Sequence, residues 1–338
     1  MPKKKITIKQ IAELSGTAPS TVSRVLSGKE CKIPVPKATR DKILSICNEL
    51  DYHPSIHASR FFAKKSKVIG FVACHDNFKR TEDLSKLLFS LCRCLFAKGY
   101  RCLPLYYDST FVESHEYINI FKRNEIDGLF IWGARPEHSF HKELFAEEFP
   151  FVFLTNKIDE YPAVYTEQFQ PVYRLTKACI DNGAKRICGI GSQHGFSFSQ
   201  RHAGFAEALK TAPNVKSKHI ELETEDFVEE LTSRLSEITE FKPDAVVCAN
   251  DLMAITVERH LQSLGLRIPE DVMICGGDNF TLSNYSNVSI TTFDSMSEEI
   301  AEKAADMMVE HLTNKAPLTT IKIQPQIIWR DSLKAITK

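Results

Sequence analysis

Apolar residues follow two different periods along this chain. In the first 50 residues they recur every three to four positions, in three short segments separated by Ser15-Gly16 and by residues 28–36. From Val68 onward, short apolar runs alternate with longer segments of helical spacing. The first pattern predicts a small all-helical head. The second predicts a larger body in which strands and helices alternate.

The first two segments of the head have the signals of a helix-turn-helix. Thr7 and Gln10 stand in the spacing of a capping box, in which the Thr hydroxyl accepts a backbone N–H at the helix start. Gly16 can take the positive φ of a sharp turn, and Pro19 suits a first helical turn because no N–H donor is needed there. We therefore expect one helix from Ile8 and a second from near Pro19.

The second helix has the composition of a helix that enters a DNA major groove. Its apolar residues are expected to face inward, which leaves short polar groups and one long cation on its outer side. The inward residues are Val22, Val25 and Leu26, and the outward ones are Ser20, Thr21, Ser23 and Arg24. A small helical bundle with a solvated polar face would give the same periodicity, so the charge distribution is needed to separate the two interpretations.

Net charge divides the chain near residue 65. The whole chain is neutral, with 43 Lys+Arg and 43 Asp+Glu. Residues 1–65 hold 13 basic and 5 acidic residues, a net charge of +8, which leaves −8 on the remainder. A basic head can neutralise phosphates, and an acidic body is repelled by them. This asymmetry favours a nucleic-acid-binding head over the bundle.

The body is expected to contain parallel sheets covered by helices on both faces. Strands are expected at 68–73, 100–106, 128–132, 151–154, 186–190, 244–248 and 272–275. Between the first two strands, leucines at 84, 87, 88, 91 and 95 repeat at helical spacing and end before Gly99. A chain of 338 residues is long enough for two such sheets, and ligands of these folds bind beyond the carboxyl ends of the strands.

Several other protein classes are disfavoured. The basic N-terminus lacks the apolar stretch of a signal peptide, and no run of about 18 apolar residues could span a membrane, so we expect a cytoplasmic protein without membrane contact. The 10 cysteines are scattered and imply no disulfide framework. Cys92 with Cys94, and His53 with His57, lack the second pair of ligands that a zinc site requires, so we expect no metal.

No enzyme motif is present, and we expect neither catalysis nor a cofactor. Residues 189–195 read G-x-G-x-x-x-G after a strand, which departs from the dinucleotide spacing, and no acid stands clearly about 20 residues further on. There is no phosphate-binding loop and no nucleophile elbow. His194 and His202 have no catalytic partner visible in the sequence.

The head resembles the DNA-binding domain of the lactose-repressor (LacI/GalR-type) family of bacterial transcription regulators. The resemblance rests on fixed spacings: TIKQIA at 7–12, TVSRVL at 21–26, TR at 39–40 and LDYHP at 50–54. A bare helix-turn-helix pattern would be much less specific. The resemblance implies that the following residues contact DNA: Thr7, Pro19, Ser20, Thr21, Ser23, Arg24, Lys29, Thr39, Tyr52 and Phe61.

Weaker motifs extend the resemblance over nearly the whole chain: IDGL at 126–129, R-x-x-GF at 201–205, CAND at 248–251, GGDN at 276–279 and IIWRDS at 327–332. They imply a two-lobed body like that of a periplasmic sugar-binding protein. The implied organisation is a head at 1–54, a hinge at 55–66 and an effector-binding and dimerisation body at 67–338. The chain would cross between lobes near 164–168, 293–296 and 321–328.

The effector residues that the resemblance implies are Ser197, Arg201, Asn250 and Asp278. An apolar face could be supplied by Phe78, Trp132, Phe196 or Phe280, of which Phe78 is included in the expected site. A guanidinium, an amide and a carboxylate at strand ends can bracket a ring of hydroxyls. In the alternative interpretation Arg201 is a surface arginine, and Asn250 and Asp251 cap the following helix.

Some positions depart from the family pattern. Ala18 replaces the usual capping Ser of the recognition helix, and Pro19 stands at the first base-reading position, where it offers no donor. Base selection would then rest on Ser20 and Arg24. The turn through residues 28–36 is longer than usual and carries Lys29 and Lys32, and Glu167-Gln168 replaces the usual Asp-Asn, which puts contacts from that loop in doubt.

Phe61 falls in the hinge at the position where the family inserts an apolar side chain, usually Leu, into the minor groove. Such a wedge partly unstacks a base step and bends the duplex. The alternative is a short linker whose aromatic residues pack on the body. We favour the wedge because isolated segments of this length need a partner to become helical.

The resemblance implies a transcription regulator, most simply a repressor, that acts as a homodimer on a pseudo-palindromic operator. An effector between the lobes, a sugar or alternatively a purine or other flat base, would change the lobe angle, as inducer or as corepressor. An exported solute-binding protein would explain the body alone. The dimer interface is expected on helices such as Leu84 to Leu95 and the one after Asp251, unless these residues are core. No C-terminal leucine heptad is visible, so a tetramer is not expected.

Overall fold

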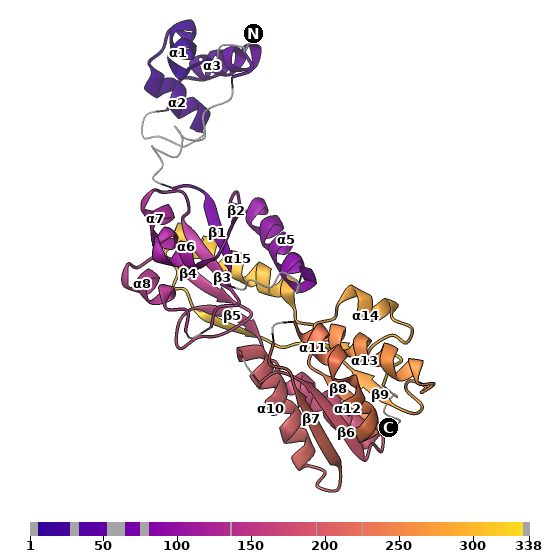
Figure 1. Ribbon diagram of the computed structural model, residues 1–338. Coiled ribbons are helices and arrows are strands. Elements are labelled where there is room, and N and C mark those ends of the chain that lie inside the picture. Colours follow the sequence, from indigo (N-terminus) through magenta and orange to yellow (C-terminus); the bar gives the residue numbers. More distant parts are fainter. Residues whose placement is uncertain are drawn as a thin grey trace. The chain divides into compact units, whose positions relative to one another are not determined.

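The computed structural model describes residues 6–27, 34–52, 65–74, 81–135, 137–193, 195–224 and 226–333. Contacts divide the chain into two units, residues 1–66 and 67–338, which we call the head and the body. The colours of the helices and strands in Figure 1 follow the sequence from indigo to yellow. In the described residues, no helix is both long and apolar enough to cross a membrane.

The head contains three helices, α1 (Ile8–Ser15), α2 (Pro19–Ser27) and α3 (Lys37–Glu49). The capping box is present: the Thr7 hydroxyl accepts from the Gln10 backbone N–H at 3.4 Å, and the Thr7 N–H donates to Gln10 Oε1 at 2.8 Å. Gly16 ends α1 with φ of 70°. The buried core residues are Ile11, Ala12, Val22, Val25, Ile43 and Cys47. The predicted helix-turn-helix is therefore confirmed.

The first lobe of the body is a six-stranded parallel sheet in the order β11-β5-β4-β3-β1-β2. Its strands are β1 (Val68–Ala73), β2 (Arg101–Leu105), β3 (Gly128–Trp132), β4 (Phe151–Leu154), β5 (Ala163–Thr166) and β11 (Thr320–Ile323). Its helices are α5 (Thr81–Ala97), α6 (Ser109–Glu113), α7 (Glu116–Lys122), α8 (Phe140–Ala146) and α15 (Ser297–Asn314). Helices α5 and α15 pack together over one face of this sheet (Figure 1).

The second lobe is a four-stranded parallel sheet in the order β7-β6-β8-β9. Its strands are β6 (Arg186–Gly191), β7 (Lys216–Glu221), β8 (Ala245–Cys248) and β9 (Met273–Cys275). Its helices are α9 (Phe169–Asp181), α10 (Phe196–Lys210), α11 (Phe227–Ser233), α12 (Leu235–Phe241), α13 (Asp251–Ser263) and α14 (Thr281–Tyr285). A small antiparallel pair, β10 (Thr292–Phe293) with β12 (Ile327–Ile328), lies where the chain runs between the lobes. The predicted two-sheet α/β fold is confirmed.

Helices α9 and α10 approach closely because Gly204 lies at their contact. A Cβ on Gly204 would stand 2.3 Å from the backbone oxygen of Phe169, so any larger residue would force the helices apart. This packing fixes the position of α10, which carries Ser197 and Arg201.

The leucines of α5 were expected either at a dimer interface or in the core of the body. Leu87, Leu91 and Leu95 are fully buried in the first lobe. The same helix exposes two aromatic side chains instead, Phe89 (74% exposed) and Phe96 (63% exposed). On α13, Met253, Val257 and Leu261 are also core residues of the second lobe. Leu87, Leu91 and Leu95 are therefore core residues, as in the alternative, because they cover the parallel sheet. That α5 takes part in a dimer interface stays a prediction.

Candidate DNA-binding and effector sites

Helix α2 presents the side chains that were expected to face DNA. Pro19 and Ser20 are exposed, and Thr21, Ser23 and Arg24 are half-buried, whereas Val22 and Val25 are buried against α1 and α3. The Arg24 Nε lies 3.5 Å from the backbone oxygen of Ser20, one turn earlier. A helix of this kind presents short hydroxyls and one guanidinium on a single side, which suits phosphate and base-edge contacts.

The other predicted DNA-contacting residues of the head have different surroundings. Thr7 is exposed at the start of α1, and Thr39 is half-buried in α3. Tyr52 packs against the core of the head, and burial next to Cys47 raises the pKa of its phenol. Its ring therefore helps to stabilise the head, in addition to any contact that its hydroxyl makes. Lys29 and Phe61 lie outside the described residues.

In the body, Arg201 connects three separate segments. Its guanidinium pairs with both carboxylate oxygens of Asp278, at 3.2 Å for Oδ2 and closer for Oδ1. Its Nε donates to Gln168 Oε1 at 3.0 Å, and it also donates to the backbone oxygen of Ala249. The side chain is only 6% exposed. Arg201 is thus no surface arginine, and the alternative that treated it as one is wrong.

Gln168 was missed as a partner of Arg201. The substitution of Gln for the usual Asn suggested only that contacts from this loop were in doubt, yet the longer side chain reaches the guanidinium. The neighbouring Glu167 accepts from the backbone N–H groups of Phe169 at 2.8 Å and Gln170 at 3.0 Å, which caps α9. The Glu-Gln pair therefore places the crossover segment beside Arg201.

Asn250 and Ser197 have contacts of their own. Asn250 caps α13, since its Oδ1 accepts from the Met253 N–H at 3.0 Å. Ser197 Oγ lies 3.4 Å from the backbone oxygen of Thr155, which follows β4 in the first lobe. Ser197 therefore stands where the two lobes face each other, and Asn250 has the capping role that was considered for it.

Asp251 fixes the segment that bears Asp278. Its carboxylate is fully buried and accepts from Thr292 Oγ1 at 2.6 Å and from the Phe280 N–H at 2.8 Å. Burial, partly offset by the hydrogen bond from Thr292, raises the pKa of Asp251 to about 7. A group with this pKa is partly protonated near neutral pH. No sequence signal indicated this role, because Asp251 stands at a helix start and was interpreted as a possible cap.

The aromatic candidates differ in their access to a ligand. Trp132 and Phe280 are each only 6% exposed. Phe196 is half-buried, with its ring 5.2 Å from that of Tyr165 in an edge-to-face contact. Phe78 lies outside the described residues. Among the described candidates, Phe196 therefore has the most ring surface open to solvent.

A small cavity lies behind Arg201, inside the second lobe. It has a volume of about 20 Å³, enough for one water molecule, and is lined by residues that include His202, His219 and Phe205. Ser197, Asn250 and Asp278 do not line it. This cavity is too small for a sugar, and Arg201 is the one described residue of the expected effector set that lines it.

The described residues hold no group of three or more His, Cys, Asp or Glu side chains that could bind a metal ion. The nine described cysteines are all free thiols: Cys47, Cys74, Cys92, Cys94, Cys102, Cys179, Cys188, Cys248 and Cys275.

Comparison with known families matches both units of the chain. Residues 7–55 match "Bacterial regulatory proteins, lacI family", and residues 176–333 match "Periplasmic binding protein-like domain". Curated relatives match over nearly their whole length. The HTH-type transcriptional repressor PurR of Vibrio vulnificus is 25% identical over 98% of this chain and 99% of its own, and PurR of Erwinia tasmaniensis is 26% identical over 97% and 96%.

Solved structures share the fold. A lac repressor dimer bound to operator and the anti-inducer ONPF has a TM-score of 0.83 at 20% identity, covering 98% of this chain and 100% of that chain. The complex of the transcriptional regulator CelR with cellobiose has a TM-score of 0.69 at 20% identity, covering 97% and 99%. The helix-turn-helix head, the two-lobed body and these full-length matches together show that this protein is a member of the lacI family of bacterial transcription regulators.

Proposed function

We propose that this protein is a cytoplasmic, homodimeric repressor that binds a pseudo-palindromic operator and is controlled by a small hydroxylated ligand, a sugar or a sugar derivative, between its lobes. The observation that carries the ligand proposal is the buried ion pair of Arg201 with Asp278 at the ends of the second sheet's strands. Carboxyl ends of parallel strands are where ligands of α/β folds bind.

The bonding state of Arg201 restricts the chemistry of the ligand. Four of its five N–H groups already donate to Gln168, Ala249 and Asp278. The groups proposed to serve a ligand are the remaining N–H on Nη2, acceptor oxygens of Asp278, the amide hydrogens of Asn250 and the hydroxyl of Ser197. A ligand rich in hydroxyl groups can donate to the carboxylate and accept from the amide. The fold neighbour CelR was solved with cellobiose, a ligand of this class.

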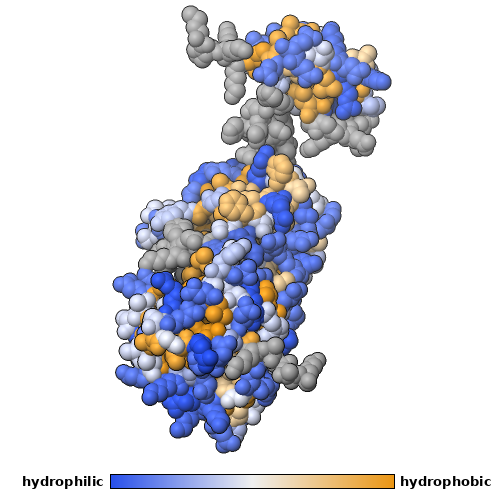
Figure 2. Space-filling view, turned by 90° about the vertical axis from the view of Figure 1, so that its right-hand side faces the viewer, coloured by the Kyte–Doolittle hydropathy of each residue, from blue (hydrophilic) through white to orange (hydrophobic). Residues whose placement is uncertain are grey.

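The dimer is proposed to form through exposed apolar side chains on both lobes. Phe89, Phe96 and Leu103 are exposed on α5 and β2 of the first lobe. Leu282 and Tyr285 are exposed on α14 of the second lobe, at 58% and 77%. Figure 2 views the body from the side of α5 and α14, and apolar side chains interrupt the polar surface there. A dimer joins two heads, so that the second half-site contact becomes intramolecular.

On the operator, Ser20 and Arg24 are proposed to read base edges, and Pro19 to make apolar contact. Thr7, Thr21, Ser23, Lys29, Thr39 and Tyr52 are proposed to contact the backbone. Phe61 is proposed to wedge into the minor groove between the two half-sites. If Phe61→Ala bends the selected operator as much as the unsubstituted protein does, the wedge proposal is wrong.

In the effector site, Phe78 is proposed to supply an apolar surface for the ligand.

The function is tested in two steps with purified full-length protein. The first is selection of bound duplexes from a random library, which should return sequences with two-fold symmetry and a binding constant that falls with salt. The second is a thermal-shift screen of neutral sugars, sugar phosphates and purines. A ligand at 100 times its Kd should contribute about 2.7 kcal/mol, which is visible in a melt. If the selection enriches no duplex sequence, the operator proposal is wrong. If only purines raise the melting temperature, the proposal of a sugar effector is wrong.

A further inference from the structure

The segment after β9 carries three side chains with different partners. Asp278 pairs with Arg201, as described above. Asn279 donates to Asp294 Oδ2 at 2.9 Å, and Thr281 donates to Glu82 Oε1 through both its N–H and its hydroxyl, at 2.6 Å each. Glu82 belongs to α5 in the first lobe, so this short segment connects the candidate effector site directly to the other lobe.

The backbone of this segment is held in an unusual conformation. Asp278 and Asn279 have φ of 87° and 51°, in the left-handed region that costs free energy for residues with a side chain. Asn279 Oδ1 also accepts from the Arg330 guanidinium at 2.6 Å. Such a conformation persists only while its contacts hold it. Loss of the contact between Arg201 and Asp278 therefore removes one of the contacts that hold this backbone, and the position of Thr281, three residues further along, depends on that backbone.

The chain segments that cross between the lobes are hydrogen-bonded to one another. Thr166 Oγ1 donates to the Ser295 backbone oxygen at 2.6 Å. The Asp294 N–H donates to the Gln326 oxygen at 2.9 Å, and the Glu167 N–H donates to the Ile323 oxygen at 2.9 Å. Because each crossover is hydrogen-bonded to another, we treat residues 166–167, 294–295 and 323–326 as one unit. We call it the hinge bundle, which is distinct from the hinge expected at residues 55–66.

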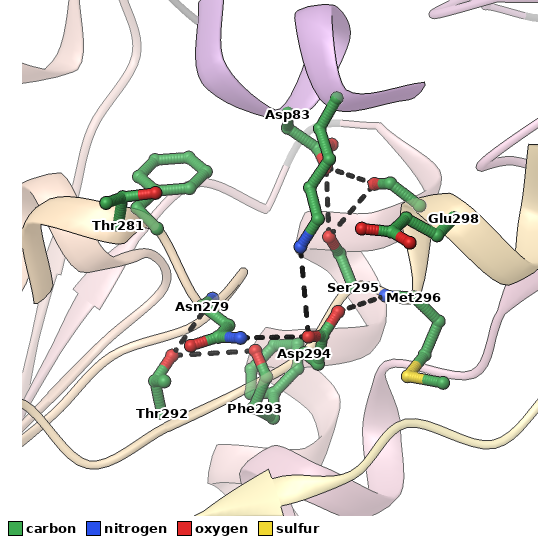
Figure 3. A network of polar contacts seen from close by, with 12 residues as sticks. Asp83, Asn279, Thr281, Thr292, Phe293, Asp294, Ser295, Met296 and Glu298 are labelled. Carbon is green, nitrogen blue, oxygen red and sulfur yellow. Dashed lines mark hydrogen bonds and ion pairs between the residues drawn. The ribbon is translucent and has the colours of Figure 1, made fainter. Parts of the chain in front are cut away.

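The first turns of α5 hold the hinge bundle (Figure 3). Asp83 Oδ1 accepts from Ser295 Oγ at 2.9 Å and from Ser297 Oγ. Lys86 Nζ lies 4.0 Å from Asp294 Oδ2, the oxygen that also accepts from Asn279. Loss of hydration at this junction, together with nearby Asp278, raises the pKa of Asp83. The two hydroxyl donors offset part of that cost.

Helix α5 reaches from the hinge bundle to the proposed dimer face. Its buried leucines pack on the first sheet and on α15, so the helix moves with its lobe as a rigid element. Phe89 and Phe96 lie on its exposed side, two and four turns after Glu82. A small rotation at Glu82 is therefore carried to these aromatic side chains.

We propose that Glu82, Asp83 and Lys86 form a latch that couples the Arg201–Asp278 pair to the proposed dimer face on α5. While the pair is intact, Thr281 and Asn279 hold α5 at one angle to the second lobe. A ligand that donates to Asp278 weakens the bonds between this carboxylate and Arg201, which loosens Thr281 and Asn279 and lets α5 rotate. The latch rests on the proposed function for its biological meaning, but the coupling itself needs neither DNA nor ligand.

The test is amide hydrogen exchange of the full-length protein, read by mass spectrometry at the start of α5 and across residues 276–285. Asp278→Asn weakens the pair with Arg201 and should raise exchange at the start of α5 about fivefold or more, although no residue there is changed. Glu82→Ala should raise exchange at residues 276–280 by a similar factor. The matched control is Glu298→Ala, an exposed carboxylate beside the latch whose ion-pair partner, Arg93 of α5, lies in the same lobe.

The double variant Glu82→Ala/Asp278→Asn should exchange no faster at these two places than the faster single variant, since either change opens the same latch. The proposal would be overturned if each substitution raised exchange only in its own segment, or if the increases of the two single variants multiplied in the double variant. The dimer dissociation constant is the second readout, and Glu82→Ala should change it several-fold while Glu298→Ala leaves it unchanged. A protein that is monomeric throughout would refute the proposed dimer, while the exchange data would still decide the latch.

Discussion

Arg201 and Asp278 lie 77 residues apart in sequence, on α10 and on the segment after β9, and form an ion pair whose side chains are only 6% and 13% exposed. The pair ties the crossover at Gln168 to the ends of two strands of the second sheet. Its burial means that changes to either residue act on stability as well as on ligand binding. Variants at this pair therefore need a stability measurement beside every binding measurement.

Substitution of Arg201 alone should lower the free energy of unfolding more than substitution of both Arg201 and Asp278. Arg201→Met leaves the Asp278 carboxylate without its counter-charge and should lower the free energy of unfolding by about 3–5 kcal/mol. Arg201→Met/Asp278→Asn should cost less than Arg201→Met alone, because Asn needs no counter-charge and tolerates the positive φ at this position. Urea unfolding of the full chain measures both. A double variant whose loss equals the sum of the single losses would contradict the coupling.

The pKa of Asp251 predicts a slope in stability between about pH 4 and pH 7. The pKa of this carboxyl is about 7 in the folded protein and about 3.8 when unfolded, so the folded state binds the extra proton. The contribution of Asp251 to stability is therefore lost as pH rises through this range, and it levels off above pH 7. Asp251→Asn keeps one oxygen for the Phe280 N–H, and its new amide nitrogen can donate to Thr292 Oγ1 in place of the bond that Asp251 accepts. Because the amide does not titrate, this variant should remove that part of the slope.

The measurement is urea unfolding at several pH values, with Glu240→Gln on α12 as the control, since Glu240 is an exposed carboxylate. The control should keep the slope of the unsubstituted protein. An Asp251→Asn variant with the same slope would show that this carboxyl is ionised in the folded protein at low pH.

Arg24 and Lys29 should differ in what they contribute to DNA binding. Arg24→Ala should cost about 1–3 kcal/mol on the selected operator and relax the base preference at one position in each half-site. Lys29→Ala should weaken binding to all duplexes alike and reduce the salt slope by about 1. Titrations on the operator and on single-base variants at several salt concentrations separate the two effects. Unchanged base selectivity in Arg24→Ala would reject its role in base reading.

A charge on the exposed side of α5 should break the proposed dimer. Phe89→Asp places a carboxylate among the apolar side chains of the interface and should shift sedimentation toward the monomer mass of 38.3 kDa. Phe145→Asp on α8 is the matched control, because Phe145 is 61% exposed but lies on another helix. An unsubstituted protein that sediments as a monomer or a tetramer at micromolar concentration would contradict the model, as would a Phe89→Asp dimer.

The sequence determined the elements whose signals are local. The capping box at Thr7, the turn at Gly16 and the apolar period of α2 each depend on residues within one or two helical turns, so the head could be predicted in detail. The buried parallel strands were visible as apolar runs for the same reason. Strand β7 was missed because it lies at the edge of its sheet and its sequence, KSKHIE, has no apolar run.

Tertiary structure alone decided which side chains of these elements meet. The sequence showed that Leu87 and Phe89 both lie on α5, but only packing against the sheet and α15 decided that the leucine is core and the phenylalanine is exposed. The resemblance named Arg201 and Asp278, whereas their bonding to Gln168 and the approach of Glu82 to Thr281 across 199 residues depend on how the lobes pack. Periodicity and capping report neighbours along the chain, and contacts between distant segments follow only from the shape of the folded lobes.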